Sequence, residues 1–315
     1  MVIKKHFRFS SSDGVHKIHG IMWKPDDREI IGVLQIIHGM VEHIDRYDAF
    51  ARYMCAHGFV VAGEDHLGHG YSVKSDEELG MFAKKNGSEY VIADNYRLKK
   101  HMEREFEGVP YFVLGHSMGS FIARVFMARH SEELDGVIIM GTGNQPVIAT
   151  TFGKGLAGII AAVKGHDYRS QLINNIAFGA YNKRFQPSRT PYDWLTKDEA
   201  IVDEYKQNKL CTYIFTVSGY KDLFTWIHDS GKVEILRKTR TDLPVFVVSG
   251  AQDPVGGFGR GVKTVYEKLK EADLEDVTLE LYENDRHEIL NETDRAMVYE
   301  DILKWIISKM PSDNN

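Results

Sequence analysis

Residues 111–120 read YFVLGHSMGS, and this stretch decides the fold. Its first four residues are apolar, as in a buried strand, and helix-like spacing of apolar residues begins at Phe121. Gly115 and Gly119 lie two residues before and two residues after Ser117. Small residues at these places let the backbone turn sharply from strand to helix, which lifts the serine hydroxyl above the sheet. Because a helix amino terminus also favours negative charge, the pattern predicts that Ser117 is a nucleophile.

Short apolar runs of the same kind recur on both sides of this stretch, each followed by turn residues. They span residues 33–37, 59–62, 137–140, 245–248 and 277–282. The runs are continuous rather than alternating, which is typical of buried parallel strands. Helix-like stretches separate several of them, so we expect an α/β fold with a mostly parallel, doubly wound sheet. In such sheets the chemistry gathers at the carboxyl ends of the strands.

One part of the chain lacks this alternation. Residues 144–236 are polar, rich in aromatic residues and helix-like, and the strand pattern resumes at Val245. Since both flanks belong to the sheet pattern, we expect residues 1–143 and 237–315 to form the core, and residues 144–236 an inserted, mainly helical cap. The aromatic rings of the cap either pack against one another or line an acyl pocket, and the sequence leaves both readings open.

The composition is that of an ordinary globular protein of 315 residues, of which 43% are apolar and 27% charged. A net charge of −6 without a basic stripe argues against nucleic acid as a partner. No apolar segment follows the basic residues at the start of the chain, so a signal peptide is not expected. The longest apolar stretch, residues 147–163, is interrupted by Lys154 and glycines, and we expect it to be too short and too mixed to span a bilayer.

The cysteine content bears on the cellular compartment. Only Cys55 and Cys211 occur, and no CxxC pair is present, so both are expected to be free thiols in a reducing environment. The sequence therefore favours a cytoplasmic protein with, at most, peripheral membrane contact through the cap. It leaves the oligomeric state open.

A serine nucleophile needs a base that removes its proton and an acid that orients the base. With a serine on such a turn, the acid and then the base should follow in chain order, each just after a later strand. Asp253 follows the run 245–248, and His287 follows the run 277–282. We therefore expect Asp253 as the acid and His287 as the base. The rival acids and bases do not follow a core strand at the right place; they are Asp222, Asp229, Asp242, Asp285, His166 and His228.

Acyl transfer also requires backbone amides that stabilise the oxyanion. One is expected at Met118, directly after the nucleophile, and the other at Met40, in the loop that follows the run 33–37. His38 and Glu42 are expected to fix this second loop through hydrogen bonds.

A metal site is a possible alternative reading of three residues that lie close together, Asp65, His66 and His69. No second ligand cluster, HExxH or CxxC motif accompanies them, and the neighbouring glycines favour a tight loop instead. We therefore expect no metal and no organic cofactor.

Five segments of the chain, taken together, resemble the monoacylglycerol lipase and lysophospholipase group of α/β hydrolases. They are HGMVEHIDRY at 38–47, DHLGHGYS at 65–72, GHSMGS at 115–120, SGAQDPVG at 249–256 and RHEILNE at 286–292. The segments cover both halves of the predicted sheet in the same order. No cap residue matches a known head-group site of the group.

This resemblance implies the α/β-hydrolase fold and a serine esterase without a cofactor. By similarity, Ser117, Asp253 and His287 form the catalytic triad, and Met40 and Met118 supply the oxyanion amides. The implied substrate is a small acyl ester, such as a monoacyl lipid with a single chain. Two other classes stay open: a thioesterase, amidase or peptidase on the same triad, and a non-enzymatic binding protein, for which a broken triad would be typical.

Overall fold

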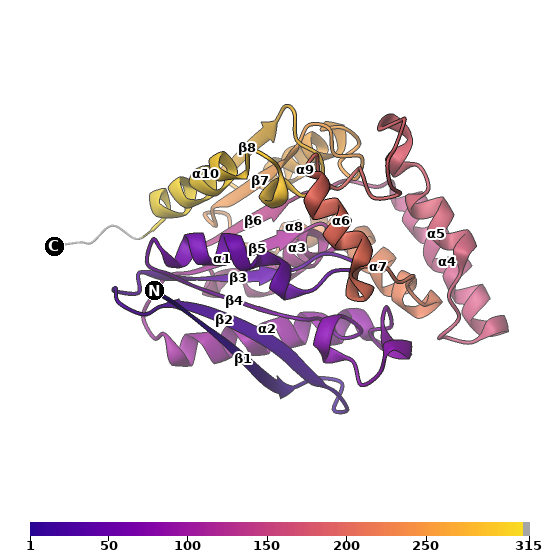
Figure 1. Cartoon of the computed structure of the whole chain (residues 1–315), viewed down its shortest axis with the longest axis horizontal. Coiled ribbons are helices and arrows are strands. Elements are labelled where there is room, and N and C mark those ends of the chain that lie inside the picture. The colour runs from indigo at the N-terminus through magenta and orange to yellow at the C-terminus, as the bar shows by residue number, and fades with distance from the viewer. Residues whose placement is uncertain (311–315) are drawn as a thin grey trace.

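The computed structural model describes residues 1–310, and its centre is an eight-stranded sheet (Figure 1). The strand order is β1-β2-β4-β3-β5-β6-β7-β8. The strands are β1 (Val2–Ser10), β2 (Lys17–Pro25), β3 (Gly32–Ile37), β4 (Phe59–Glu64), β5 (Tyr111–His116), β6 (Gly136–Met140), β7 (Val245–Gly250) and β8 (Val277–Tyr282). Strands β3 to β8 pair in parallel, whereas β1 and β2 extend one edge in antiparallel fashion. The predicted mostly parallel sheet is confirmed.

Two details of the strand prediction were wrong. Strands β1 and β2 were not predicted, since half-buried and exposed positions alternate in β1 and it has no continuous apolar run. Strand β8 was predicted to be buried, but it is the edge strand and alternate residues face solvent. An edge strand needs an apolar side chain only on the face that a helix covers.

Helices cover both faces of the sheet, which explains why the central strands are apolar on both sides. α1 (Asp48–Cys55) and α10 (Arg295–Ser308) pack on one face. α2 (Gly87–Glu105), α3 (Met118–His130) and α9 (Arg260–Glu271) pack on the other. Successive residues of a strand point to opposite faces, so Val113 joins the second cluster and Leu114 the first.

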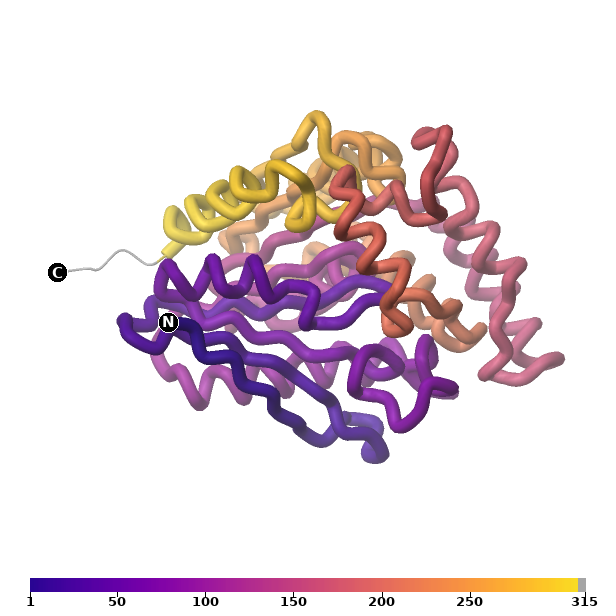
Figure 2. The backbone as a smooth tube through the Cα atoms, viewed as in Figure 1, coloured from indigo at the N-terminus to yellow at the C-terminus, as the bar shows by residue number. Residues whose placement is uncertain are grey.

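The chain between β6 and β7 is helical and lies at the carboxyl ends of the parallel strands. It forms α4 (Val147–Lys164), α5 (Gln171–Phe178), α6 (Glu199–Gln207), α7 (Val217–Ser230) and α8 (Val233–Leu236). Figure 2 shows α4 and α5 at one end of the molecule, away from the amino terminus, with α6 nearer the middle of the view. Helix α7 packs against α3 and α2 of the core as well as against α4. The segment is helical, and α7 and α8 also pack against the core helices α2, α3 and α9.

Two cationic side chains, one buried and one half-buried, each contact both the start of the inserted segment, at residues 143–144, and the end of α7, at residues 230–231. Arg124 of α3 donates to the carbonyls of Gly143 and Ser230, at 3.1 and 3.0 Å. Lys268 of α9 contacts the side-chain oxygen of Asn144 at 3.0 Å and the carbonyl of Gly231. Both cations also lie near the carboxyl end of α7, where positive charge is favourable.

Helix α4 bears on the expectation that residues 147–163 are too short and too mixed to span a bilayer. Its 18 residues run without interruption, because the interior glycines each cost only about 1 kcal/mol of helix stability and packing on α7 offsets that cost. Only 11% of the helix is buried, and by length and composition it is the one helix within residues 1–310 that could cross a membrane.

Candidate active site

Ser117 lies on a sharp turn between β5 and α3 that requires glycine at positions 115 and 119. It caps α3 with φ 54° and ψ −117°, a conformation that non-glycine residues rarely adopt. A Cβ atom on Gly115 would overlap the carbonyl of Gly119, and one on Gly119 would overlap the carbonyl of Ile37. The two glycines therefore allow strand and helix to approach closely, and Ser117 faces the large cavity of the molecule.

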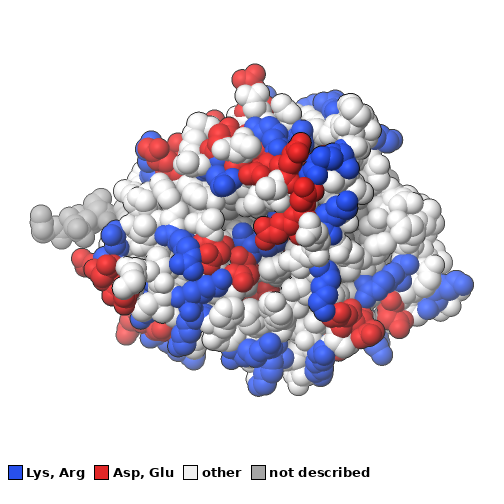
Figure 3. Space-filling view, viewed as in Figure 1, with Lys and Arg blue, Asp and Glu red and all other residues white. Residues whose placement is uncertain are grey.

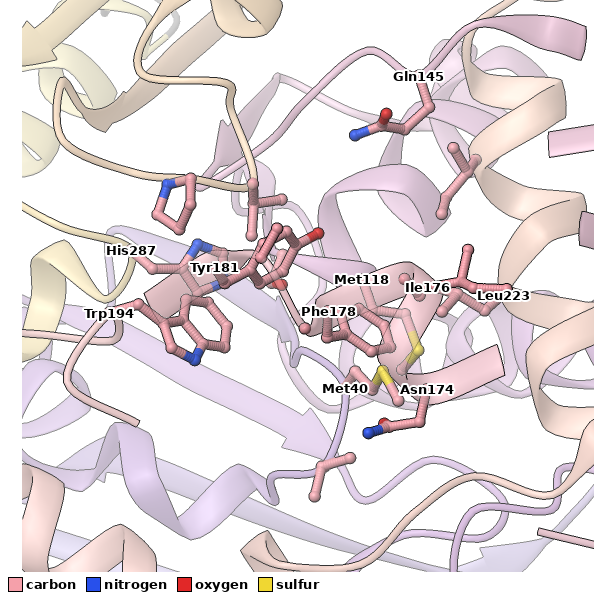
Figure 4. Close-up of a pocket in the computed structure, with 18 of the residues that line it drawn as sticks. Met40, Met118, Gln145, Asn174, Ile176, Phe178, Tyr181, Trp194, Leu223 and His287 are labelled. Carbon is pink, nitrogen blue, oxygen red and sulfur yellow. The ribbon is translucent and has the colours of Figure 1, made fainter. Parts of the chain in front are cut away.

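Asp253 and His287 lie side by side at the ends of β7 and β8. His287 Nδ1 is 2.9 Å from Asp253 Oδ2, and both side chains are buried. The other carboxylate oxygen, Oδ1, accepts the Val255 amide at 2.8 Å, which fixes the orientation of the acid. Because Nδ1 faces the carboxylate, Nε2 is the ring nitrogen left for the cavity. Ser117 and His287 both line this cavity, and Figure 4 shows the His287 side chain in it.

Asp285, the rival acid closest to the histidine in sequence, has a different partner. Its side chain is buried, and Oδ1 lies 2.9 Å from Lys197 Nζ. Burial raises the pKa of Asp285 to about 6, although Lys197 opposes the shift. The rival histidine His228 pairs with its neighbour Asp229. Neither rival residue lines the cavity.

The loop after β3 presents one free amide to the cavity. The Gly39 amide donates to Glu42, and the Val41 amide donates to His69 Nε2 at 3.4 Å. Between them, the Met40 amide meets no protein acceptor within residues 1–310. The Met118 amide is the first of α3, where N–H groups lack an intrahelical acceptor. Met40 and Met118 both line the cavity (Figure 4).

A buried polar network beneath this loop joins the three catalytic segments. The Glu42 carboxylate accepts from Tyr47 Oη at 2.9 Å, from Arg46 at 2.9 Å and from His116 Nδ1 at 3.2 Å. Arg46 also makes two 2.7 Å bonds to Glu288, beside the base. His116 Nε2 lies 3.3 Å from the carbonyl of His287. The sequence indicated only that Glu42 fixes the loop; the partners were missed, because residues far apart in the chain supply them.

The charges in this network shift the pKa values of its members. Burial alone would raise the pKa of Glu42, but His116 and Arg46 outweigh it and hold the pKa well below its usual range. Burial alone would lower the pKa of His116, but the hydrogen bond and charge of Glu42 outweigh it and raise the pKa. The pair thus favours a charged carboxylate beside a protonated imidazole.

The cluster of Asp65, His66 and His69 holds loops together. Asp65 accepts the amides of Ile44 and Tyr71, both at 2.8 Å. His66 Nε2 lies 3.2 Å from the carbonyl of His38, and burial lowers the pKa of His69 to about 4. Within residues 1–310, no group of three potential ligands is placed to hold a metal ion.

The cavity between core and cap has a volume of about 1130 Å³ and a mainly apolar lining. Its cap side includes Phe178 and Phe224, two of the cap aromatic residues, and several apolar residues that the sequence did not single out: Phe152, Leu156, Ile173, Ile176, Leu223 and Ile227. The Trp194 ring lies beside His287, with ring centroids 5.0 Å apart, and Tyr181 follows at 5.0 Å from Trp194 (Figure 4). Some cap rings therefore line the pocket, while others, such as Trp226, are fully buried against the core.

Comparisons with known proteins agree on one group of enzymes. A family model described as serine aminopeptidase, S33 matches residues 28–294. Monoacylglycerol lipase of Mycolicibacterium smegmatis is 27% identical over 305 residues, which are 96% of either chain. Human monoglyceride lipase is 24% identical over 290 residues, 90% of this chain and 84% of that protein. The structure of a thermostable carboxyl esterase from Bacillus coagulans superposes with a TM-score of 0.90 at 27% identity, covering 97% of this chain and 98% of that one.

Proposed function

Because the chain belongs to the serine aminopeptidase S33 family of hydrolases, we propose that it is a serine carboxylic-ester hydrolase acting on monoacyl lipids or similar single-acyl esters. The predicted α/β-hydrolase fold is confirmed by the close superposition on an esterase. Relatives that align over almost the whole chain are monoacylglycerol lipases. The observation that carries the proposal is an apolar cavity lined by Ser117 and His287, with Asp253 hydrogen-bonded to the histidine.

The proposed reaction has two steps. His287 removes the proton of Ser117, and the alkoxide attacks the acyl carbon while the amides of Met40 and Met118 stabilise the oxyanion. His287 then protonates the leaving alcohol, and a water molecule, activated in the same way, releases the acid from the acyl-enzyme. Asp253 fixes the histidine tautomer and stabilises its protonated form. These groups complete the reaction without a metal or organic cofactor.

The lining of the cavity favours an acyl ester over a peptide with a free amino terminus. An aminopeptidase needs a free carboxylate for the substrate ammonium group, since a buried charge requires a partner. The carboxylates among the described lining residues are Glu42 and Glu288, and both are already paired with Arg46. Apolar side chains dominate the rest of the surface and suit an acyl chain.

We also propose peripheral membrane contact through α4 and α5. Six of their side chains are more than half exposed: Ile148, Phe152, Ile159, Val163, Leu172 and Ile176. Figure 3 shows a broad uncharged area at this end of the molecule. Phe152 and Ile176 also line the cavity, so the apolar surface continues into the proposed acyl site. Lys154, in the middle of α4, favours a helix that lies on the membrane rather than one that crosses it.

A cytoplasmic location remains part of the proposal. Cys55 and Cys211 are both free and buried, as expected of thiols in a reducing compartment. The substrate is then a single-acyl ester at the inner surface of a membrane or in solution.

The test is hydrolysis of a matched ester, thioester and amide series that carries the same acyl group. We expect the ester to be the best substrate and a fluorophosphonate to label Ser117 alone. Ser117→Ala should lower kcat on the order of a million-fold, as truncation of such a nucleophile does in related mechanisms, while the protein stays folded. Preference for the amide, or full activity of Ser117→Ala, would contradict the proposal.

A further inference from the structure

One segment of the cap, Asp193–Asp198, contacts the loop that carries His287 along most of its length. The segment lies between the exposed helix α5 and helix α6. Three hydrogen bonds involving backbone groups join it to the loop: Glu288 N to Leu195 O at 2.7 Å, Thr196 Oγ1 to Asn291 O at 3.0 Å, and Lys197 N to Glu292 Oε2 at 3.0 Å. This part of the cap is therefore fastened to the catalytic core.

Charge strengthens the same connection. Lys197 Nζ lies 2.9 Å from Asp285 and 3.8 Å from Glu292, whose side chains are 1% and 0% exposed. Arg286, beside the base, donates to the carbonyls of Asp193 and Thr196. Lys197 is the cation that neutralises two buried carboxylates of the histidine loop. Removing one partner of a buried pair leaves an uncompensated charge, which is strongly destabilising locally.

The segment also touches the catalytic base directly. The Trp194 ring lies against one side of the His287 ring, with centroids 5.0 Å apart, and the His116 ring lies 4.8 Å away. Trp194 is three residues before Lys197 in the same short segment. Lys197 itself does not line the cavity. Because Lys197 does not contact the cavity, we expect a change at Lys197 to act mainly through the position of the segment and the loop.

We propose that Lys197 is a positioning residue: by pairing with Asp285 and Glu292, it holds the Asp193–Asp198 segment, and with it Trp194, against His287. This inference rests on the proposed esterase function. It divides the cap into a fixed segment, which holds the base in place, and the exposed helices α4 and α5, for which we propose membrane contact. Misplacing a base by about 1 Å can lower the rate about a hundredfold, so the ion pair contributes to kcat without contacting the substrate.

The test compares Lys197→Met with Lys209→Met on a short, water-soluble ester. Lys209 is the matched control, since it also joins cap to core, through an exposed ion pair with Asp76 at 3.1 Å, but lies away from the histidine loop. We expect Lys197→Met to lower kcat by about 10- to 100-fold with KM changed less than about twofold, because no substrate contact is lost. Lys197→Arg should restore most of the rate, and Lys209→Met should resemble the wild type.

A second variant guards against misfolding. Lys197→Met/Asp285→Asn removes both members of the Lys197–Asp285 ion pair, so no unpaired carboxylate is left at position 285. The ion pair that holds the Asp193–Asp198 segment is still missing in this variant. We expect this double variant to fold and to keep the low kcat.

The final readout does not require activity. The low-field proton NMR signal of the His287–Asp253 hydrogen bond, assigned by its loss in His287→Gln, should shift or broaden in Lys197→Met and stay unchanged in Lys209→Met. The inference would be overturned if Lys197→Met and Lys197→Met/Asp285→Asn both kept the wild-type kcat and the NMR signal were unchanged in Lys197→Met. If the wild type hydrolyses no ester, the proposed function fails, and the NMR signal alone decides whether Lys197 positions the histidine.

Discussion

Asp253 and Asp285 lie on neighbouring loops, and each is buried beside a different basic side chain. Asp253 contacts His287 Nδ1, whereas Asp285 contacts Lys197. We expect Asp253→Asn to lower kcat roughly 10⁴-fold, because the amide favours the wrong imidazole tautomer. Asp285→Asn should lower kcat by no more than about a hundredfold, since it affects only the position of the loop.

Steady-state kinetics on one ester, with the folded fraction of each variant checked by thermal unfolding, decides between the two carboxylates. A larger loss in Asp285→Asn than in Asp253→Asn would mean that the acid has been assigned to the wrong residue.

The Glu42–His116 pair predicts a particular dependence of stability on pH. The raised pKa of His116 means that its contribution is present below about pH 6.5 and is lost as the pH rises through the folded pKa. The lowered pKa of Glu42 means that its contribution is present above about pH 4.5 and is lost as the pH falls through the folded pKa. The pair therefore stabilises the fold most between these limits.

Glu42→Gln should accordingly lose more unfolding free energy at about pH 5.5 than at about pH 9. Urea unfolding at the two pH values measures the difference from the wild type. Glu300→Gln, which removes an exposed pair with Lys304, is the control and should show no such difference. An equal loss for Glu42→Gln at both pH values would show that His116 is not charged in the folded protein.

At the scale of elements, α4 exposes several large apolar side chains. Ile159 and Val163 are 67% and 74% exposed and do not line the cavity. Ile159→Glu/Val163→Glu should weaken binding to phosphatidylcholine vesicles at least about tenfold, because each buried aliphatic side chain contributes about 1.5–3 kcal/mol. Hydrolysis of a soluble short ester should be unchanged.

Vesicle sedimentation measures the binding. The control is Met297→Glu/Ile307→Glu on α10, two positions that are 48% and 50% exposed on a helix outside the cap. Equal vesicle binding by both double variants would remove the proposed membrane contact from α4.

For the whole molecule, the cavity between core and cap predicts how the rate depends on acyl length. Each methylene buried in it strengthens transition-state binding by up to about 0.8 kcal/mol, or about fourfold in kcat/KM. We expect kcat/KM to rise over several carbons and then to level off when the cavity is full. Leu156→Trp, at a lining position in α4, should shift the plateau to shorter chains.

A series of p-nitrophenyl esters of increasing length measures this dependence. A flat response in the wild type would favour a small-ester hydrolase over a lipase-like enzyme. Replacing the whole segment 144–236 with a linker would not test the cavity alone. Helix α7 packs against α3, so its removal would also expose the core.

The sequence by itself determined the parallel sheet and the turn at Ser117. Both depend on local requirements: continuous apolar runs for strands that are covered on both faces, and glycines where a Cβ would meet the backbone. It also led to Asp253 and His287 as the candidate pair, because a residue just past a parallel strand must lie at one edge of the sheet. Strands β1 and β2 escaped prediction; in β1, half-buried and exposed positions alternate, so it offers no continuous apolar run.

Only the tertiary structure decided which distant side chains meet. Glu42, Arg46 and Glu288 form one network, and Lys197 reaches Asp285 from the cap, across 88 residues of chain. The same holds for the cap, where the structure alone separates rings that line the cavity from rings that are buried in the core. The reason is physical: a hydrogen bond or an ion pair depends on separation in space, and the sequence pattern of one element does not specify which other element packs against it.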